Sequence, residues 1–383
     1  MRTLAIVTIL MMGLSSFARC QRSGLTDDEK ELIRQADEES ADLASSGMLF
    51  EDSSQIAYLE TILHRLGGKV NDFSSRFFHA GIVRSPQPNS FSFPNGHIYA
   101  TTGLMSLCHN EGELAFILAH EIGHIVKRHA YQMLQRSRSV SDRLDFPLYG
   151  LGSMLAGISL RRYSIATEIE ADIYGESLMS ACGYDPWNSV RIMESFAEEE
   201  KEDSVNWKLS MMKAGGLAYE FPLPPGGHPE TPDRIALLKK LITTSPPTVF
   251  DAVARQRYAS SIFPTLIAEG YLDLQYGDYR SAGRTVAKAV AVNPTNAEAR
   301  LVIAELFRQK SASDVQEAIR RYRKVLEIDS TNALAYRGLG IVFQRLDQRS
   351  DARTSFQQYL RYRPDAPDRL FILKYVGEYS GEN

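Results

Sequence analysis

One five-residue segment, His120 to His124 with the sequence His-Glu-Ile-Gly-His, constrains the fold more than any other stretch of the chain. It lies in an apolar run that begins after Asn110, an N-cap residue with Glu113 three positions on as its capping-box partner, so we expect a helix here. Residues four apart on a helix differ by about 40° in azimuth, so both imidazoles project from one face and could share a Zn²⁺ ion. Glu121 falls beside that face, where its carboxylate could take a proton from an attacking water.

A catalytic zinc site needs a third protein ligand and keeps its fourth position open. A histidine six residues after the second one is excluded, because that position holds Ala130. A carboxylate on a second helix is the other common solution, and Glu168 and Asp172 place two carboxylates four residues apart. We expect Glu168 to ligate the metal and Asp172 to accept the outer N–H of a ligating imidazole. The alternative for this pair is a solvated acidic face, and His129 is expected to lie on the surface at the helix end.

Two patterns place the remaining elements of the first domain. Residues 27–66 are expected to be helix-rich, because apolar residues repeat there at helical spacing. Residues 81–83, 91–93 and 97–101 alternate like strands, and Pro94-Asn95-Gly96 supplies turn chemistry between the last two runs. We therefore expect a small antiparallel sheet.

The chain beyond about residue 250 is repetitive. Gly270, Ala282 and Pro294 recur 70 residues later as Gly340, Ala352 and Pro364, which corresponds to two units of about 34 residues with two extra residues. We interpret this as three tetratricopeptide repeats, at about 263–296, 297–332 and 333–366, with a capping helix to Tyr379. A non-repetitive helical bundle is the alternative.

Length and composition predict a multi-domain chain that does not bind nucleic acid. The chain has 383 residues, and its 43 Lys and Arg against 47 Asp and Glu give a net charge of −4, with no basic surplus for a phosphate backbone. We expect a signal peptide over 1–20, a catalytic domain over 21–250 and a repeat domain over 251–383. A second apolar stretch, 146–160, is too short and too glycine-rich to span a bilayer, so no membrane span is expected in the mature chain.

The N-terminal segment predicts export. Its Met-Arg start, an apolar run of roughly eleven residues and a small-x-small site near Ala18 are typical of a cleaved signal peptide, since a membrane anchor needs about 20 apolar residues. Lipidation of Cys20 is an alternative that Arg19 disfavours. Export would also permit a disulfide between Cys108 and Cys182.

Several of these motifs together resemble the HtpX/Oma-type gluzincin metallopeptidases. The resemblance covers roughly residues 50–240, and its motifs are residues 119–124, 168–172, 175, 181–186, 228–229 and 234–235. Residues 91–104 are similar to the substrate-side hairpin of that family. With an export signal and tetratricopeptide repeats, the chain most resembles the periplasmic BepA-type members. One departure is that the family commonly has Ser-Arg before the ligating glutamate, whereas Ile165 follows Ser164 here, and Arg161 or Arg162 could substitute.

The resemblance implies a fold that is mainly α with a small antiparallel sheet, in which a zincin-like metallopeptidase domain precedes an α-solenoid. It implies one Zn²⁺ per chain, catalytic roles for Glu121 and His228, and a supporting role near the metal for Arg234. His228 would stabilise the oxyanion or occupy the open metal position. A polypeptide substrate would lie along the edge formed by Ser90, Phe91, Ser92 and Phe93 as an added strand.

Two functions of different classes follow. The first is a zinc endopeptidase that acts on unfolded or misassembled exported proteins in the periplasm, with a chaperone role and a repeat partner in the outer-membrane assembly machinery. The second is a protein-binding module in which the repeats capture other proteins and the zinc domain is regulatory.

Overall fold

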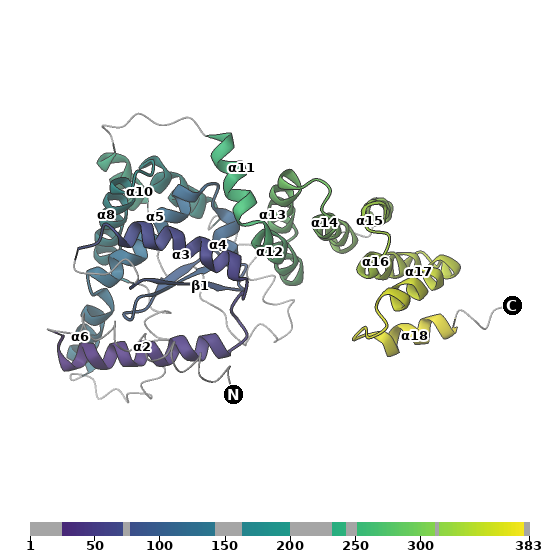
Figure 1. The fold of residues 1–383 in the computed structure, drawn as a ribbon, viewed down its shortest axis with the longest axis horizontal. Helices are drawn as coiled ribbons and strands as arrows, with labels where there is room; N and C mark the ends of the chain where they lie inside the picture. The colour runs from purple at the N-terminus through teal and green to yellow at the C-terminus, as the bar shows by residue number, and fades with distance from the viewer. Residues whose placement is uncertain are drawn as a thin grey trace, which may run out of the picture. The chain divides into compact units, whose positions relative to one another are not determined.

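The structure, a computed structural model, describes residues 25–71, 77–141, 163–199, 232–242, 251–310 and 314–378. Its contacts divide the chain into two compact units, the first extending to Ser261 and the second beginning at Ile262. Figure 1 draws both units as helical structures, the first of which also contains a small sheet. The domain limits at residues 20 and 250 remain predictions.

The first unit surrounds the sheet with helices, most of which begin at a polar cap. Asn110 caps the helix that carries the His-Glu-Ile-Gly-His segment by accepting from the backbone N–H of Glu113 at 3.0 Å, as expected. Glu113 bonds the backbone N–H of His109, one residue before the cap, at 2.7 Å. The helices of this unit whose bounds lie within the described residues are α2 (Asp27–Ser45), α3 (Ser53–Gly67), α4 (Thr102–Leu107), α5 (Glu111–Val126), α6 (His129–Ser141), α8 (Ile165–Ala181), α10 (Pro232–Leu241) and α11 (Ala252–Ser261), and residues 187–199 are helical as well.

The sheet has three strands in the order β1-β3-β2: β1 (His79–Val83), β2 (Ser90–Ser92) and β3 (His97–Thr101). The predicted hairpin is confirmed, because β2 and β3 pair antiparallel and Gly96 in the turn adopts a φ of 96°. The expectation of a wholly antiparallel sheet is wrong, since β1 pairs with β3 in parallel. The cause is the strand order: β3 lies between β1 and β2, so the strand that follows β1 in sequence is not its neighbour.

The described residues of the second unit form three helix pairs and a last helix. The pairs fall in the three ranges predicted for the repeats, which confirms the helical repeat architecture. They are α12 (Phe263–Tyr276) with α13 (Tyr279–Val292), α14 (Ala297–Lys310) with α15 (Val315–Ile328), and α16 (Ala333–Arg345) with α17 (Arg349–Tyr362), followed by α18 (Arg369–Glu378).

Small residues let the helices of this unit approach closely. A Cβ on Gly338 would lie 2.2 Å from the Tyr322 ring, and a Cβ on Gly340 would lie 2.5 Å from the Phe356 ring. Both rings are fully buried in one core cluster. The repeated glycine is therefore a packing requirement, since any larger side chain would separate adjacent helices.

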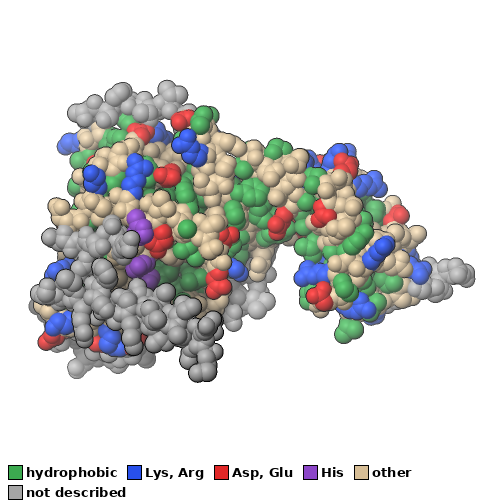
Figure 2. Space-filling view, viewed as in Figure 1, with side chains coloured by type: hydrophobic (Ala, Val, Ile, Leu, Met, Phe, Trp, Pro, Cys, Tyr) green, Lys and Arg blue, Asp and Glu red, His purple; other side chains and the backbone are tan. Residues whose placement is uncertain are grey.

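Two observations concern the surface and the helices of the described residues. On the face drawn in Figure 2, described Lys and Arg side chains lie among Asp and Glu side chains, without a basic stripe. Within the described ranges, no helix has the length and apolar character needed to cross a bilayer. The predictions for residues 1–20, including Cys20, and for residues 146–160 lie outside the described residues.

Candidate metal centre

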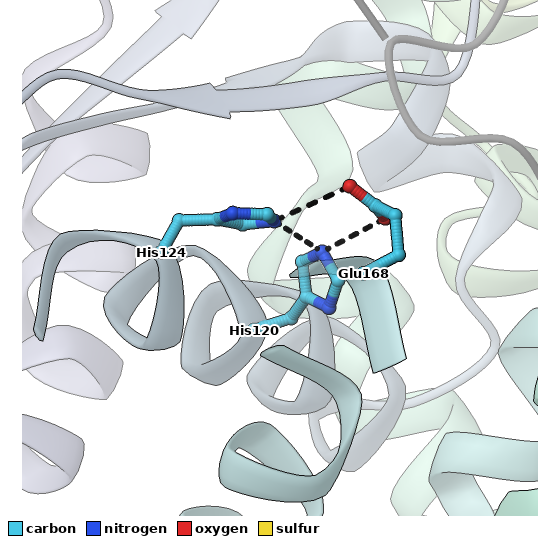
Figure 3. Close-up of side chains that lie close together, drawn as sticks. All are labelled: His120, His124 and Glu168. Carbon is cyan, nitrogen blue, oxygen red and sulfur yellow. Dashed lines mark hydrogen bonds and ion pairs between the residues drawn. The ribbon is translucent and has the colours of Figure 1, made fainter. Parts of the chain in front are cut away.

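Two adjacent helices bring together the three predicted ligands. His120 and His124 project from α5, and Glu168 faces them from the first turn of α8 (Figure 3). The two Nε2 atoms lie 2.9 Å apart, and each lies 3.6 Å from an oxygen of Glu168. Ligand atoms around a tetrahedral zinc ion with bonds of 2.0–2.2 Å lie roughly 3.3–3.6 Å apart. Both nitrogen–oxygen distances match this spacing, the two Nε2 atoms lie closer together than it, and the donor set is one that zinc prefers. Among the described residues, this is the one His/Cys/Asp/Glu group with metal-site spacing.

The helix contact depends on small residues at the crossing of α5 and α8. A Cβ on Gly175 would lie 2.8 Å from the backbone nitrogen of His120, and a Cβ on Gly123 would lie 3.3 Å from the Ala171 backbone. Ser164 caps α8 by accepting from the N–H of Thr167, which fixes where that helix begins. The backbones therefore approach closely enough for ligands from both helices to meet.

Asp172 contacts the first imidazole, as predicted. Its Oδ1 lies 2.9 Å from His120 Nδ1, and this hydrogen bond leaves Nε2 for the metal position. Arg234 of α10 donates to both oxygens of Asp172 at 2.7 Å and lies 3.1 Å from Glu168 Oε2. Burial alone would raise the pKa of Asp172, but the hydrogen bonds from Arg234 and His120 outweigh it and lower that pKa. The carboxylate stays ionised in a site from which water is excluded.

The cation beside Glu168 thus comes from α10. We considered Arg161 and Arg162 for this place, and both lie outside the described residues, as does His228. Arg234 lies 66 residues after Glu168 in the sequence and is 1% exposed. No pattern in the sequence predicted that Arg234 contacts Glu168, because only the tertiary fold brings α10 against α8.

The expectation that His129 lies on the surface is wrong. His129 is 1% exposed, and its Nδ1 lies 2.8 Å from Nδ1 of His124. The cause is a chain reversal between α5 and α6, where Arg128 adopts a φ of 56°, in the left-handed region. A continuous helix would direct His129 away from His124, whereas this turn brings its ring back to the candidate metal site.

Glu121, the predicted base, is held by two serine hydroxyls. Ser90 Oγ donates to Glu121 Oε1 at 2.6 Å, and Ser92 Oγ donates to Oε2 at 2.8 Å. Alternation along β2 directs Phe91 and Phe93 to the opposite face, where both are buried against one core cluster. The side chains of Phe91 and Phe93 are therefore part of the core, and only the backbone of these two residues could take part at the predicted substrate edge.

Two further observations concern Tyr163 and the two described cysteines. Tyr163 stacks on His124 with ring centroids 4.1 Å apart, a contact that sequence patterns did not indicate, and burial raises the pKa of its hydroxyl. Cys108 and Cys182 are both buried and are not bonded to each other, so the disulfide considered for them is not formed. The described chemistry is concentrated where α5, α8, α10 and β2 meet.

Comparisons with known proteins agree with this geometry. Residues 53–242 match the family described as Peptidase family M48, and residues 310–347 match a TPR repeat. The mitochondrial metalloendopeptidase OMA1 of Schizosaccharomyces pombe is 29% identical over 173 residues, which cover 42% of this chain and 49% of that protein. The beta-barrel assembly-enhancing protease of Escherichia coli is 24% identical over 230 residues, which cover 56% of this chain and 45% of that protein.

The chain spans less than half of the length of each of these relatives. The family match covers all three candidate metal ligands and Glu121, and the repeat match falls in the second unit. The chain therefore carries a peptidase domain of family M48 over residues 53–242 and resembles OMA1 and the beta-barrel assembly-enhancing protease, with a tetratricopeptide repeat after the peptidase domain.

Proposed function

We propose that this protein is a zinc-dependent endopeptidase with one Zn²⁺ ion per chain. The observation that carries the proposal is the convergence of His120, His124 and Glu168, whose three donor atoms all lie within 4.8 Å of one another and are buried. Two imidazoles and one carboxylate match the ligand set of catalytic zinc sites, which keep an open position for substrate. The match to family M48 supports a metallopeptidase activity.

A zinc ion bound there would supply Lewis acidity that polarises the scissile carbonyl and makes water more acidic. The residues of the chain supply the remaining chemistry. Glu121 would accept a proton from the attacking water and deliver it to the leaving amine. Ser90 and Ser92 would hold that carboxylate in place, because each hydroxyl donates to a different oxygen of it. Asp172 would fix the tautomer of His120.

The backbone of β2 supports binding of an extended polypeptide. Phe93 donates to His97 O, and Thr101 donates to Asn89 O, so the residues on either side of β2 bond to β3. The backbone groups of Ser90 and Ser92 therefore point away from β3, at the edge of the three-stranded sheet and on the strand that holds Glu121. A substrate strand added along this edge would place its peptide bonds beside the base.

We propose unfolded or misassembled exported proteins as the substrate class and the periplasm as the location. An edge strand recognises main chain rather than a particular side chain, which suits unfolded polypeptides. The N-terminal sequence predicts export, and the printed names of several relatives, beta-barrel assembly-enhancing protease, support a role in envelope protein quality control. The partner proposed for the repeats is outer-membrane assembly machinery.

A second function has its own observation. The three helix pairs and last helix of the second unit form a repeat array whose usual use is protein contact, so the chain could act as a binding module or chaperone. The two functions predict different effects of a substitution at Glu121. If binding alone carries the cellular function, Glu121→Gln leaves it intact, whereas a protease loses it.

Digestion of casein, an unfolded substrate, tests the proposal. We expect the purified full chain to cleave casein, a chelator to stop cleavage, and added Zn²⁺ to restore it. Glu121→Gln should keep its zinc and lose cleavage, while Glu111→Gln, at the start of the same helix and away from the ligands, should cleave like wild type. Zinc-loaded wild-type protein that leaves casein and other unfolded proteins intact would contradict the proposal.

A further inference from the structure

We infer that His129 is a positioning residue of the metal site, which fixes His124 in the tautomer that presents Nε2 to zinc. The inference rests on the proposed zinc site and extends it. Asp172 performs the corresponding task for His120 through a 2.9 Å contact between Oδ1 and Nδ1. His129 lies in the same place relative to His124, with its Nδ1 2.8 Å from Nδ1 of that residue.

The contact between the two rings defines the position of one proton. Two ring nitrogens 2.8 Å apart are at hydrogen-bond distance, so one of them carries a proton and the other accepts it. The His129 side chain is fully buried, which leaves no room for water to compete. If His124 binds zinc through Nε2, its single proton sits on Nδ1, so His124 is the donor and His129 is the acceptor.

The same assignment satisfies the other nitrogen of His129. A neutral His129 that accepts at Nδ1 carries its proton on Nε2, which lies 3.4 Å from Oε2 of Glu170. Glu170 in turn pairs with Lys127 at 3.0 Å. The contacts therefore form one chain from His124 through His129 and Glu170 to Lys127, in which each proton has an acceptor.

The opposite assignment does not fit metal binding. If His129 donated from Nδ1, His124 would accept at Nδ1 and would carry its own proton on Nε2, facing His120 Nε2 2.9 Å away. That nitrogen could then not bind zinc without losing the proton. His129 thus selects between a metal-binding and a non-binding state of His124, while the stacked ring of Tyr163 restrains the ring plane.

Two substitutions separate this role from packing. In His129→Asn the side-chain oxygen can occupy the place of Nδ1 and accept from His124, whereas His129→Leu fills similar volume and accepts nothing. Partners of this kind are typically worth 10- to 100-fold in metal affinity. We therefore expect His129→Leu to bind zinc about 10- to 100-fold more weakly than wild type and His129→Asn to recover most of that loss.

Competition between the full-length protein and a chromophoric zinc chelator measures the affinity. His109→Leu is the matched control, because it removes a histidine that also lies beside a carboxylate, Glu113, at the start of α5. We expect wild-type affinity in this control. Thermal unfolding of each metal-free variant reports whether packing has changed, and His129→Asn keeps the test valid if the leucine variant does not fold.

Each outcome has a distinct meaning. Weaker zinc binding in His129→Leu with recovery in His129→Asn supports the inference. Wild-type affinity in His129→Leu, or an equal loss in both variants, overturns the inference while the zinc site stands. Wild-type protein that takes up no zinc overturns the proposed function and the inference together.

Discussion

Replacing Arg234 by leucine should strongly destabilise the first unit. The guanidinium of Arg234 contacts Asp172 twice at 2.7 Å and Glu168 once at 3.1 Å, and the side chains of all three residues are at most 2% exposed. Removing one partner of a buried ion pair costs about 3–5 kcal/mol, because the remaining charge is left buried without compensation. Two carboxylates lose their cation here, so we expect a loss near the upper end, about 4–5 kcal/mol.

This loss is large enough to measure directly. A domain of 150–250 residues loses about 2–4 °C in unfolding midpoint per kcal/mol, so the midpoint should fall by about 8–20 °C. Trp187 belongs to the first unit, so its fluorescence reports on that unit. The measurement uses metal-free protein with a chelator at pH 8.

Two variants serve as controls. Arg34→Gln removes a cation that pairs with Glu31 and Glu38 on the exposed face of α2, and its unfolding midpoint should stay close to wild type. Arg234→Lys keeps the charge without the planar two-point geometry and should recover part of the loss. A midpoint within about 2 °C of wild type for Arg234→Leu would refute the reasoning, since it would mean that the buried contacts contribute less than about 1 kcal/mol.

Three further substitutions test other parts of the account. Gly175→Ala should weaken zinc binding and lower the unfolding midpoint, because the new Cβ meets the α5 backbone. This is expected even though Ala is the better helix former by about 1 kcal/mol. A wild-type zinc affinity in titration calorimetry would contradict the prediction. Ser90→Ala should lower casein turnover about tenfold and leave the zinc content unchanged. The tenfold loss corresponds to roughly 1.4 kcal/mol for one hydrogen bond to the Glu121 carboxylate. Full turnover would show that the hydroxyl does not position the base. Burial, and then the nearby Glu269, raise the pKa of Asp273 to about 10. The Asp273 carboxyl therefore makes its full contribution to the stability of the second unit below about pH 4, and this contribution is lost progressively as the pH rises toward 10. Asp273→Asn should therefore slow hydrogen exchange of α12 in the full chain at pH 8 and change it little at pH 4, and equal effects at both values would argue against the raised pKa.

Local sequence rules predicted much of the metal site. Helical spacing placed His120 and His124 on one face, and the same four-residue spacing paired Glu168 with Asp172. A polar N-cap marked the start of α5, and a Pro-Asn-Gly turn marked the β2–β3 hairpin. These features depend on interactions between residues close in sequence, where backbone geometry and periodicity suffice.

The sequence could not predict features that depend on tertiary contacts or on one unusual backbone angle. The left-handed conformation of Arg128 turns His129 toward the site, although arginine rarely adopts it. Ser90 and Ser92 read as strand residues, and only the packing of β2 beside α5 shows that they bond Glu121. The parallel pairing of β1 with β3 likewise follows from the order of strands in space rather than from their individual patterns.

The metal content of a Glu168→Ala variant tests the central claim most directly, because Glu168 is the ligand that a second helix must supply. After dialysis against trace chelator, elemental analysis should find one zinc ion per chain in wild type and in Glu176→Gln, a matched change on the same helix. Glu168→Ala should retain far less than one ion while remaining folded by circular dichroism. Full zinc occupancy in Glu168→Ala would contradict the assignment of His120, His124 and Glu168 as the metal site.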